Sequence, residues 1–102
     1  MAKVIAMYRK PADVAAFEKR YFEGHAPLAK KIPGLRRYEV SSGPVNTPAG
    51  PSPYHLVAVL SFDSLAAMQQ GLGSPEGQAT AADAMSFAAG IIDLLIMDTK
   101  DV

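Results

Sequence analysis

The sequence predicts an α+β fold in which helices cover one face of an antiparallel four-stranded sheet. Segments that read as strands and helices follow the order β-α-β-β-α-β, with one additional short helix before the last long helix. This order is that of the ferredoxin-like plan. Because its crossovers are right-handed, both helical layers fall on the same side of the sheet. A second observation is that the strands are apolar on both faces, which predicts a partner on the side without helices.

Four segments carry the strand signal, because they are rich in β-branched and aromatic residues and are bounded by proline, glycine or helix-capping residues. The expected strands cover residues 2–9, 35–42, 54–62 and 91–98. The stretch 43–53 contains four of the chain's eight prolines. Proline cannot donate to a central ladder, so this stretch is expected to be a loop.

Three helices are expected between these strands. The first begins after Asp13, a good N-cap, and runs to about residue 24. Gly24 and Pro27 interrupt the apolar stripe, so a separate turn or two should follow. The second helix begins after Asp63 or Ser64 and the third begins after Ser74, all of which are capping residues.

The side-chain pattern of the strands predicts a homodimer. In the first strand Val4, Ala6 and Tyr8 face one way, and Ile5 and Met7 face the other. The third and fourth strands are apolar on both faces in the same manner. A twofold copy would place two sheets face to face, giving a dimeric α+β barrel. Roughly eight strands in such a barrel leave an interior that side chains fill or that holds one small ligand.

Composition excludes several classes of function. The chain of 102 residues predicts one domain covering residues 1–102. Ten basic and ten acidic side chains cancel, so neither nucleic acid nor an anionic membrane is an expected partner. Cysteine is absent, which removes disulfides and thiolate chemistry and suits a cytoplasmic location. No apolar run approaches the length of a membrane helix. Nucleotide-binding, serine-hydrolase and zinc-protease motifs are also missing, so no cofactor or metal is expected.

His25 is the candidate catalytic residue. It lies on the apolar stripe of the first helix, near its end. A neutral imidazole there could act as acid or base near neutral pH. The alternative is a structural histidine that caps backbone carbonyls with help from the helix dipole.

Other side chains are candidates for ligand binding. The hydroxyls of Tyr8, Tyr21 and Tyr38 could line a pocket and orient a phenol or quinone, although tyrosines also border most small cores. His55 is either a pocket residue or an ordinary residue at the start of a strand, projecting opposite to the next side chain. Met7 offers adaptable lining for an apolar or aromatic ligand, but most such methionines belong to a core.

Several short segments together resemble a known family. They are His25–Leu28, Ile32–Leu35, Tyr38–Val40, Leu60–Leu65 and Ser74–Gly77. In this order they resemble the EthD-like proteins, which are named for ethyl tert-butyl ether degradation. The resemblance implies a dimeric α+β barrel and a role in the oxidative degradation of organic compounds. It supplies no established catalytic residues.

Three hypotheses about function remain open at this point. The favoured one is a small-molecule-binding protein or cofactor-free enzyme acting on an apolar compound, with His25 handling protons. The family resemblance implies an oxidoreductase of the monooxygenase type. The second is a non-catalytic module that binds a metabolite in an oxidative pathway. The third is a haem-binding barrel with His25 as axial ligand.

Overall fold

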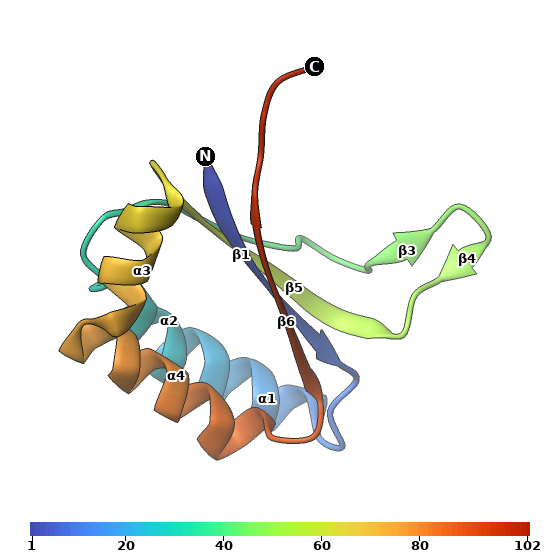
Figure 1. Cartoon of the computed structure of the whole chain (residues 1–102). Helices are drawn as coiled ribbons and strands as arrows, with labels where there is room; N and C mark the ends of the chain where they lie inside the picture. The colour runs from blue at the N-terminus through green and yellow to red at the C-terminus, as the bar shows by residue number, and fades with distance from the viewer.

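The computed structural model of the chain describes residues 1–102. Its elements are drawn in Figure 1. In order they are β1 (Ala2–Arg9), α1 (Val14–Arg20), a π-helical turn η1 (Tyr21–His25), α2 (Ala26–Ala29), β2 (Leu35–Val40), β3 (Asn46–Thr47), β4 (Gly50–Pro51), β5 (Tyr54–Phe62), α3 (Leu65–Gly73), α4 (Pro75–Ala88) and β6 (Ile92–Asp98).

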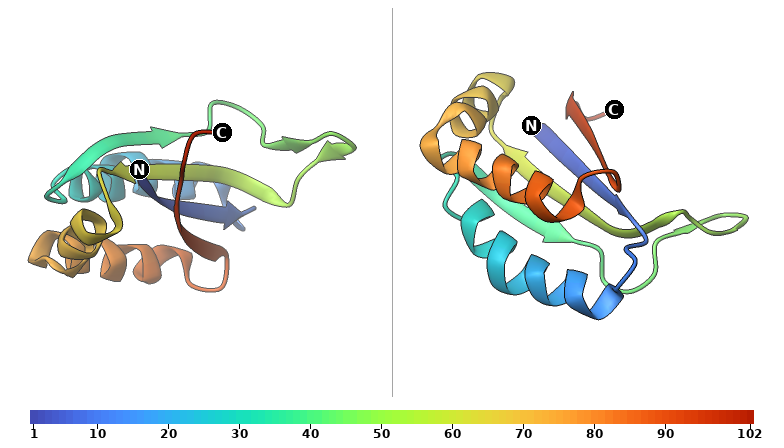
Figure 2. Two further views of the ribbon diagram at one scale, coloured as in Figure 1. Left: turned by 45° about the horizontal axis from the view of Figure 1, so that its top comes forward. Right: turned by 90° about the horizontal axis from the view of Figure 1, so that it is seen from below.

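The main sheet has four strands in the order β2-β5-β1-β6, and every neighbouring pair is antiparallel. All helices lie on one side of this sheet, and the opposite side carries none (Figures 1 and 2). This arrangement confirms the predicted ferredoxin-like fold. β1 and β5 have the expected bounds, whereas β2 ends two residues early and β6 begins one residue late.

The first helical segment differs from the prediction. It continues through Gly24 and Pro27, because a π-helical turn links α1 to α2. In this turn the N–H of Ala26 donates to the carbonyl of Tyr21, five residues back. The wider turn makes room for the proline ring, whose missing N–H is tolerated in the first turn of α2. The interruption expected from the sequence is therefore a local widening.

The core lies between the sheet and the helices. Alternate residues of β1 and β5 point into it and are buried, as the period of a strand requires. The helices contribute Phe17, Tyr21 and Met68 to the same cluster. The rings of Tyr8, Phe17 and Tyr21 pack with centroid separations of 5.4 to 6.0 Å. These aromatic contacts fix α1 and η1 on the sheet.

The other face of the sheet, here called the open face, is apolar at its centre. The cross-strand pairs Ile5–Val59, Ile5–Leu95 and Met7–Val57 place these side chains together on it. None of them is buried. The predicted double apolar character of the sheet is therefore present in the structure.

Residues 43–53, here called the arm, project from the sheet beyond the ends of its strands (Figure 1). The sequence predicts an irregular loop, but the arm contains the two-stranded hairpin β3–β4. Pro51 is compatible with this hairpin because each of its strands is an edge. At its base, the Ser52 hydroxyl donates to the carbonyl of Val45 over 2.6 Å.

Gly77 allows α3 and α4 to meet closely. The Ser74 hydroxyl caps α4 by accepting from the N–H of Gly77 over 3.0 Å. A Cβ atom on Gly77 would lie against the carbonyl oxygen of Gly71 and 2.5 Å from that of Leu72. Only glycine fits at this contact, which sets where α4 lies over the sheet.

Candidate functional site

An apolar cleft lies between α4 and the helix-covered face of the sheet. Its volume is about 220 Å³. Most of the residues that line this hollow, here called the cleft, have apolar side chains, and they come from both the sheet and the helical layer. They include Val4, Ala6 and Tyr8 of β1, Ile92, Leu94 and Ile96 of β6, Thr80, Ala84 and Met85 of α4, together with His25, Ile32, Leu60 and Leu72.

The cleft opens along the edge strand β6. No helix lies over this strand in the right-hand view of Figure 2. Leu94 and Ile96 face the same side as the core yet are 57% and 61% exposed, and Met85 across the cleft is 53% exposed. The mouth is therefore bordered by apolar side chains, which suits entry of an apolar molecule.

His25 is held at the inner wall of the cleft by a carboxylate from α4. Its Nδ1 atom lies 3.0 Å from Oδ2 of Asp83. Arg20 also donates to both oxygens of Asp83, and the Nη1–Oδ2 distance is 3.1 Å. The Arg20 guanidinium lies 5.1 Å from the ring centre of Phe87. Thus α1, η1 and α4 meet in one Arg20–Asp83–His25 cluster.

The cluster fixes the protonation of its members. Hydrogen bonds from Arg20, and less strongly from His25, lower the pKa of Asp83, so it is a carboxylate. Burial lowers the pKa of His25, and the hydrogen bond to Asp83 only partly offsets this effect. The imidazole is therefore neutral near pH 7. Because a carboxylate only accepts, Nδ1 carries the hydrogen and Nε2 has a free lone pair.

Two polar atoms bordering the cleft have no hydrogen-bond partner within the protein. Only Nδ1 of His25 is hydrogen-bonded, and the Tyr8 hydroxyl has no partner, although these residues are only 5% and 1% exposed. Every side-chain nitrogen or oxygen that is fully shielded from solvent has a hydrogen-bond partner. Both atoms therefore touch accessible space, and the cleft is the space that these residues border. Burial raises the pKa of Tyr8, so its hydroxyl stays protonated and can donate.

The other two predicted tyrosines lie behind this wall. The hydroxyls of Tyr21 and Tyr38 are 2.6 Å apart and hydrogen-bond each other. Neither residue lines the cleft. The ring of Tyr21 lies 5.3 Å from that of His25 and 5.5 Å from that of Tyr8, measured between centroids. The Tyr21–Tyr38 pair therefore supports both cleft residues from the protein side.

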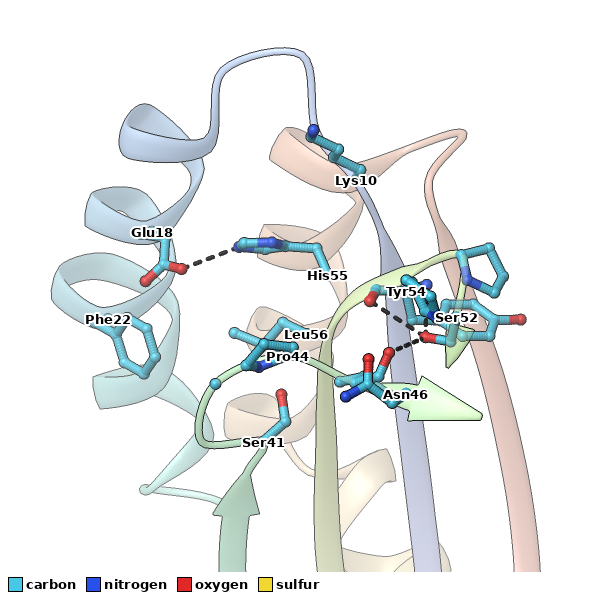
Figure 3. A pocket seen from close by; sticks show the side chains of 14 residues that line it. Lys10, Glu18, Phe22, Ser41, Pro44, Asn46, Ser52, Tyr54, His55 and Leu56 are labelled. Carbon is cyan, nitrogen blue, oxygen red and sulfur yellow. Dashed lines mark hydrogen bonds and ion pairs between the residues drawn. The ribbon is translucent and has the colours of Figure 1, made fainter. Parts of the chain in front are cut away.

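His55 lies elsewhere, at a second hollow between α1 and the arm. Its Nε2 atom is 3.0 Å from Oε1 of Glu18 (Figure 3). The expected alternation fails here because Tyr8 pairs with Leu56 and Arg9 pairs with Tyr54, which leaves His55 as an extra residue. Such a bulge turns the imidazole toward the helices. The hollow measures about 660 Å³, and its lining mixes polar side chains with prolines and a few apolar residues.

Met7 also lies away from the cleft. It follows the alternation of β1 and projects from the open face, opposite to Tyr8. The structure thus brings His25 and Tyr8 together at one site, places Tyr21 and Tyr38 behind them, and separates His55 and Met7 from them. The ligand-binding roles of these residues stay predictions.

Sequence reasoning missed Asp83 and Arg20. One signal was available for Asp83, because it is the only charged residue between Glu76 and Asp93. An isolated carboxylate within a helix of small, neutral residues indicates a specific partner. Nothing in the sequence shows that the partner is His25, which is 58 residues away.

Comparison with known proteins decides the family. The EthD domain matches residues 9–91, which is most of the chain. The chain belongs to the EthD family. An EthD family protein from Bacillus halodurans has a crystal structure that covers 98% of this chain and 99% of its own, at 40% identity and a TM-score of 0.90.

Two further relatives of this EthD chain are informative. An uncharacterized 11.0 kDa protein in the thcB–thcC intergenic region of Rhodococcus erythropolis is 40% identical over 104 residues, covering 100% of this chain and 98% of its own. A dimeric ferredoxin-like protein from Thermobifida fusca has a TM-score of 0.68 at 16% identity, covering 96% and 90% of the two chains. The second likeness shows the fold alone.

The residues of the site fit neither a metal ion nor a haem. No group of three or more histidine, cysteine, aspartate or glutamate side chains is placed to hold a metal ion. The cleft of about 220 Å³ falls below the roughly 300–1,000 Å³ of pockets for drug-sized ligands, so a haem does not fit it.

None of the helices has the length and apolar character needed to cross a membrane. The expected cytoplasmic location stays a prediction.

Proposed function

We propose that the cleft binds a small apolar organic molecule and that His25 exchanges a proton with it. One observation carries this proposal: a buried imidazole that lines an apolar cleft has Nδ1 held by Asp83, while its Nε2 has no hydrogen-bond partner in the protein. A neutral imidazole in this arrangement is a proton acceptor. The carboxylate of Asp83 would stabilise the imidazolium that forms, as an aspartate does in hydrolase triads.

This proton transfer is compatible with an oxidative role. Taking a proton from an acidic C–H or O–H bond of the ligand leaves an electron-rich anion. Such an anion can react directly with dioxygen, so a cofactor-free oxidation needs a base, an apolar site and access for oxygen. The resemblance to proteins named for ether degradation supports this role. The alternative is a non-catalytic binding module, in which His25 only forms a hydrogen bond to the bound molecule.

Binding is tested by titrating the isotopically labelled protein with toluene and following methyl resonances. The methyl groups of Leu60, Leu94 and Ile96 border the cleft and should shift together. Those of Val57 and Val59 point to the open face and serve as the internal control. Shifts confined to the open face, or none at saturating toluene, would refute binding in the cleft.

The role of His25 is tested with the His25→Gln variant. Glutamine keeps hydrogen-bonding ability but does not titrate near neutral pH. If His25 handles a proton or contacts the ligand, the variant should fold and should lose turnover or bind more weakly. A purely structural histidine predicts a loss of about 1 kcal/mol in stability with unchanged ligand affinity.

We also propose that a second copy of the chain covers the open face. The apolar centre formed by Ile5, Val57 and Leu95 is uncovered in one chain. A face of this kind needs a partner, and stable interfaces of obligate dimers bury about 2,000 Å² or more. The dimeric ferredoxin-like relative supports the same arrangement. Sedimentation at micromolar concentration should show a dimer, and a folded monomer there would contradict the proposal.

A further inference from the structure

We propose that the cleft selects small hydroxy compounds: molecules with an apolar body of about one ring and a hydroxyl group that pairs with both His25 and Tyr8. The ligand hydroxyl would donate to Nε2 of His25 and accept from the hydroxyl of Tyr8. This inference rests on the proposed function, which requires only that an apolar molecule enter the cleft. It adds the chemical group that the cleft recognises.

Few polar side chains line the cleft, and two of them have unpaired polar atoms. Three polar side chains border it: Tyr8, His25 and Thr80. The Thr80 hydroxyl already donates to the carbonyl of Glu76 over 2.8 Å. His25 and Tyr8 are more than nine-tenths buried, and Nε2 and the phenolic oxygen lack protein partners. Polar atoms kept in an apolar site without partners are costly, so a ligand that pairs with them gains binding free energy.

The two atoms offer complementary roles. Asp83 holds the hydrogen on Nδ1 of His25, so Nε2 can only accept a hydrogen bond while the ring is neutral. The Tyr8 hydroxyl is free to donate. A ligand hydroxyl matches both roles at once. An ether or ketone can accept from Tyr8 but leaves Nε2 unpaired, and a carboxylate adds a charge that the hydrocarbon walls do not compensate.

Tyr8 and His25 both line the cleft beside the same aromatic cluster. Their rings pack against the same two aromatic rings. Tyr8 lies 5.5 Å from Tyr21 and 6.3 Å from Phe87, and the corresponding distances for His25 are both 5.3 Å. A single bound hydroxyl group placed beside this aromatic cluster can therefore meet both side chains.

The volume sets the size of the apolar body. An apolar cavity of about 150 Å³ is sufficient to bind benzene. The cleft, at about 220 Å³, therefore accommodates one substituted ring. Because the mouth is open over Leu94 and Ile96, a longer hydrocarbon substituent can extend along β6.

The test compares three ligands that share one ring: toluene, 4-methylanisole and p-cresol. Affinities are measured by methyl NMR titration of the wild-type protein. We expect p-cresol to bind about tenfold more tightly than toluene, the scale of two net hydrogen bonds. We expect 4-methylanisole, which keeps the oxygen but lacks the O–H, to bind several-fold more weakly than p-cresol.

Two variants locate the selectivity. Tyr8→Phe removes only the hydroxyl, and His25→Leu removes the acceptor. Each should reduce the preference for p-cresol over toluene several-fold. If His25→Leu does not fold, Tyr8→Phe decides, because it keeps the ring that packs in the core.

The outcomes separate this inference from the proposed function. If toluene binds in the cleft and p-cresol binds no more tightly, the cleft is an apolar site and the hydroxyl inference is wrong. The inference is equally wrong if 4-methylanisole equals p-cresol, or if the preference survives in Tyr8→Phe. If none of the three ligands reaches the cleft, the proposed function fails first.

Discussion

Acidification should destabilise the folded protein through His25. In the folded state burial lowers the pKa of the imidazole, whereas in the unfolded chain it titrates near pH 6.5. Below that pH the unfolded state therefore binds a proton that the folded state does not. Linkage then requires the free energy of unfolding to fall as the pH is lowered. The stability contributed by neutral His25 is fully present above the pKa of histidine in the unfolded chain. It is lost as the pH falls toward the lower pKa of His25 in the folded protein.

The size of the effect depends on the number of protons. His25 is the one histidine that lines the cleft, and it can contribute a difference of at most one proton. One proton corresponds to a slope of no more than about 1.4 kcal/mol per pH unit. The carboxylate of Asp83 affects stability over a lower pH range. Because its pKa is lowered in the folded protein, its stabilising contribution is lost only as the pH falls below about 4. Between about pH 6.5 and 4.5 the part of the slope that is lost in a His25 variant should therefore report on His25.

The assay is urea unfolding at a series of pH values and one protein concentration, because the proposed dimerisation would make stability depend on concentration. His25→Gln should flatten the slope between about pH 6.5 and 4.5. His55→Gln is the matched control and should keep the part of the slope that belongs to His25. An unchanged slope in His25→Gln would refute the reasoning. A stability that rises on acidification would show that the ion pair with Asp83 outweighs burial.

Three further predictions concern packing and assembly. Gly77→Ala should lower the stability by about 2 kcal/mol, since its Cβ atom would meet the carbonyl of Gly71. Gly73→Ala, where a Cβ meets nothing within 4 Å, should stay within about 0.5 kcal/mol in the same thermal unfolding assay. Val57→Glu places a charge on the open face and should dissociate the dimer in sedimentation, while unchanged mass would refute this interface. Shortening the arm, residues 43–53, should change the melting temperature by only a few degrees, and a collapse would show that the arm is packed in the dimer.

The strands could be predicted closely because their signal is local. In β1 and β5 the residues alternate between two apolar faces, and the period of a strand alone places each side chain. The exception is His55, where a bulge adds one residue to β5. A bulge depends on how two strands pair across the sheet, so the pattern of one strand does not reveal it.

The helical segment at Pro27 shows a different limit. Proline and glycine are correctly read as obstacles to an α-helix. Here the aromatic contacts of Tyr21 hold the segment on the sheet, and the chain accommodates Pro27 with a π-helical turn. Tertiary packing therefore overrides a local preference.

The candidate site shows most clearly what the sequence omits. The residue type and apolar stripe identify His25 as a group that could transfer a proton, but its chemistry depends on which ring nitrogen is free. That choice is made by Asp83 of α4, whose Oδ2 atom lies 3.0 Å from Nδ1 of His25. The position of α4 depends in turn on the close contact at Gly77. A close contact between two helices, far from His25 in the sequence, therefore helps to place the carboxylate that keeps the hydrogen on Nδ1 and leaves Nε2 free.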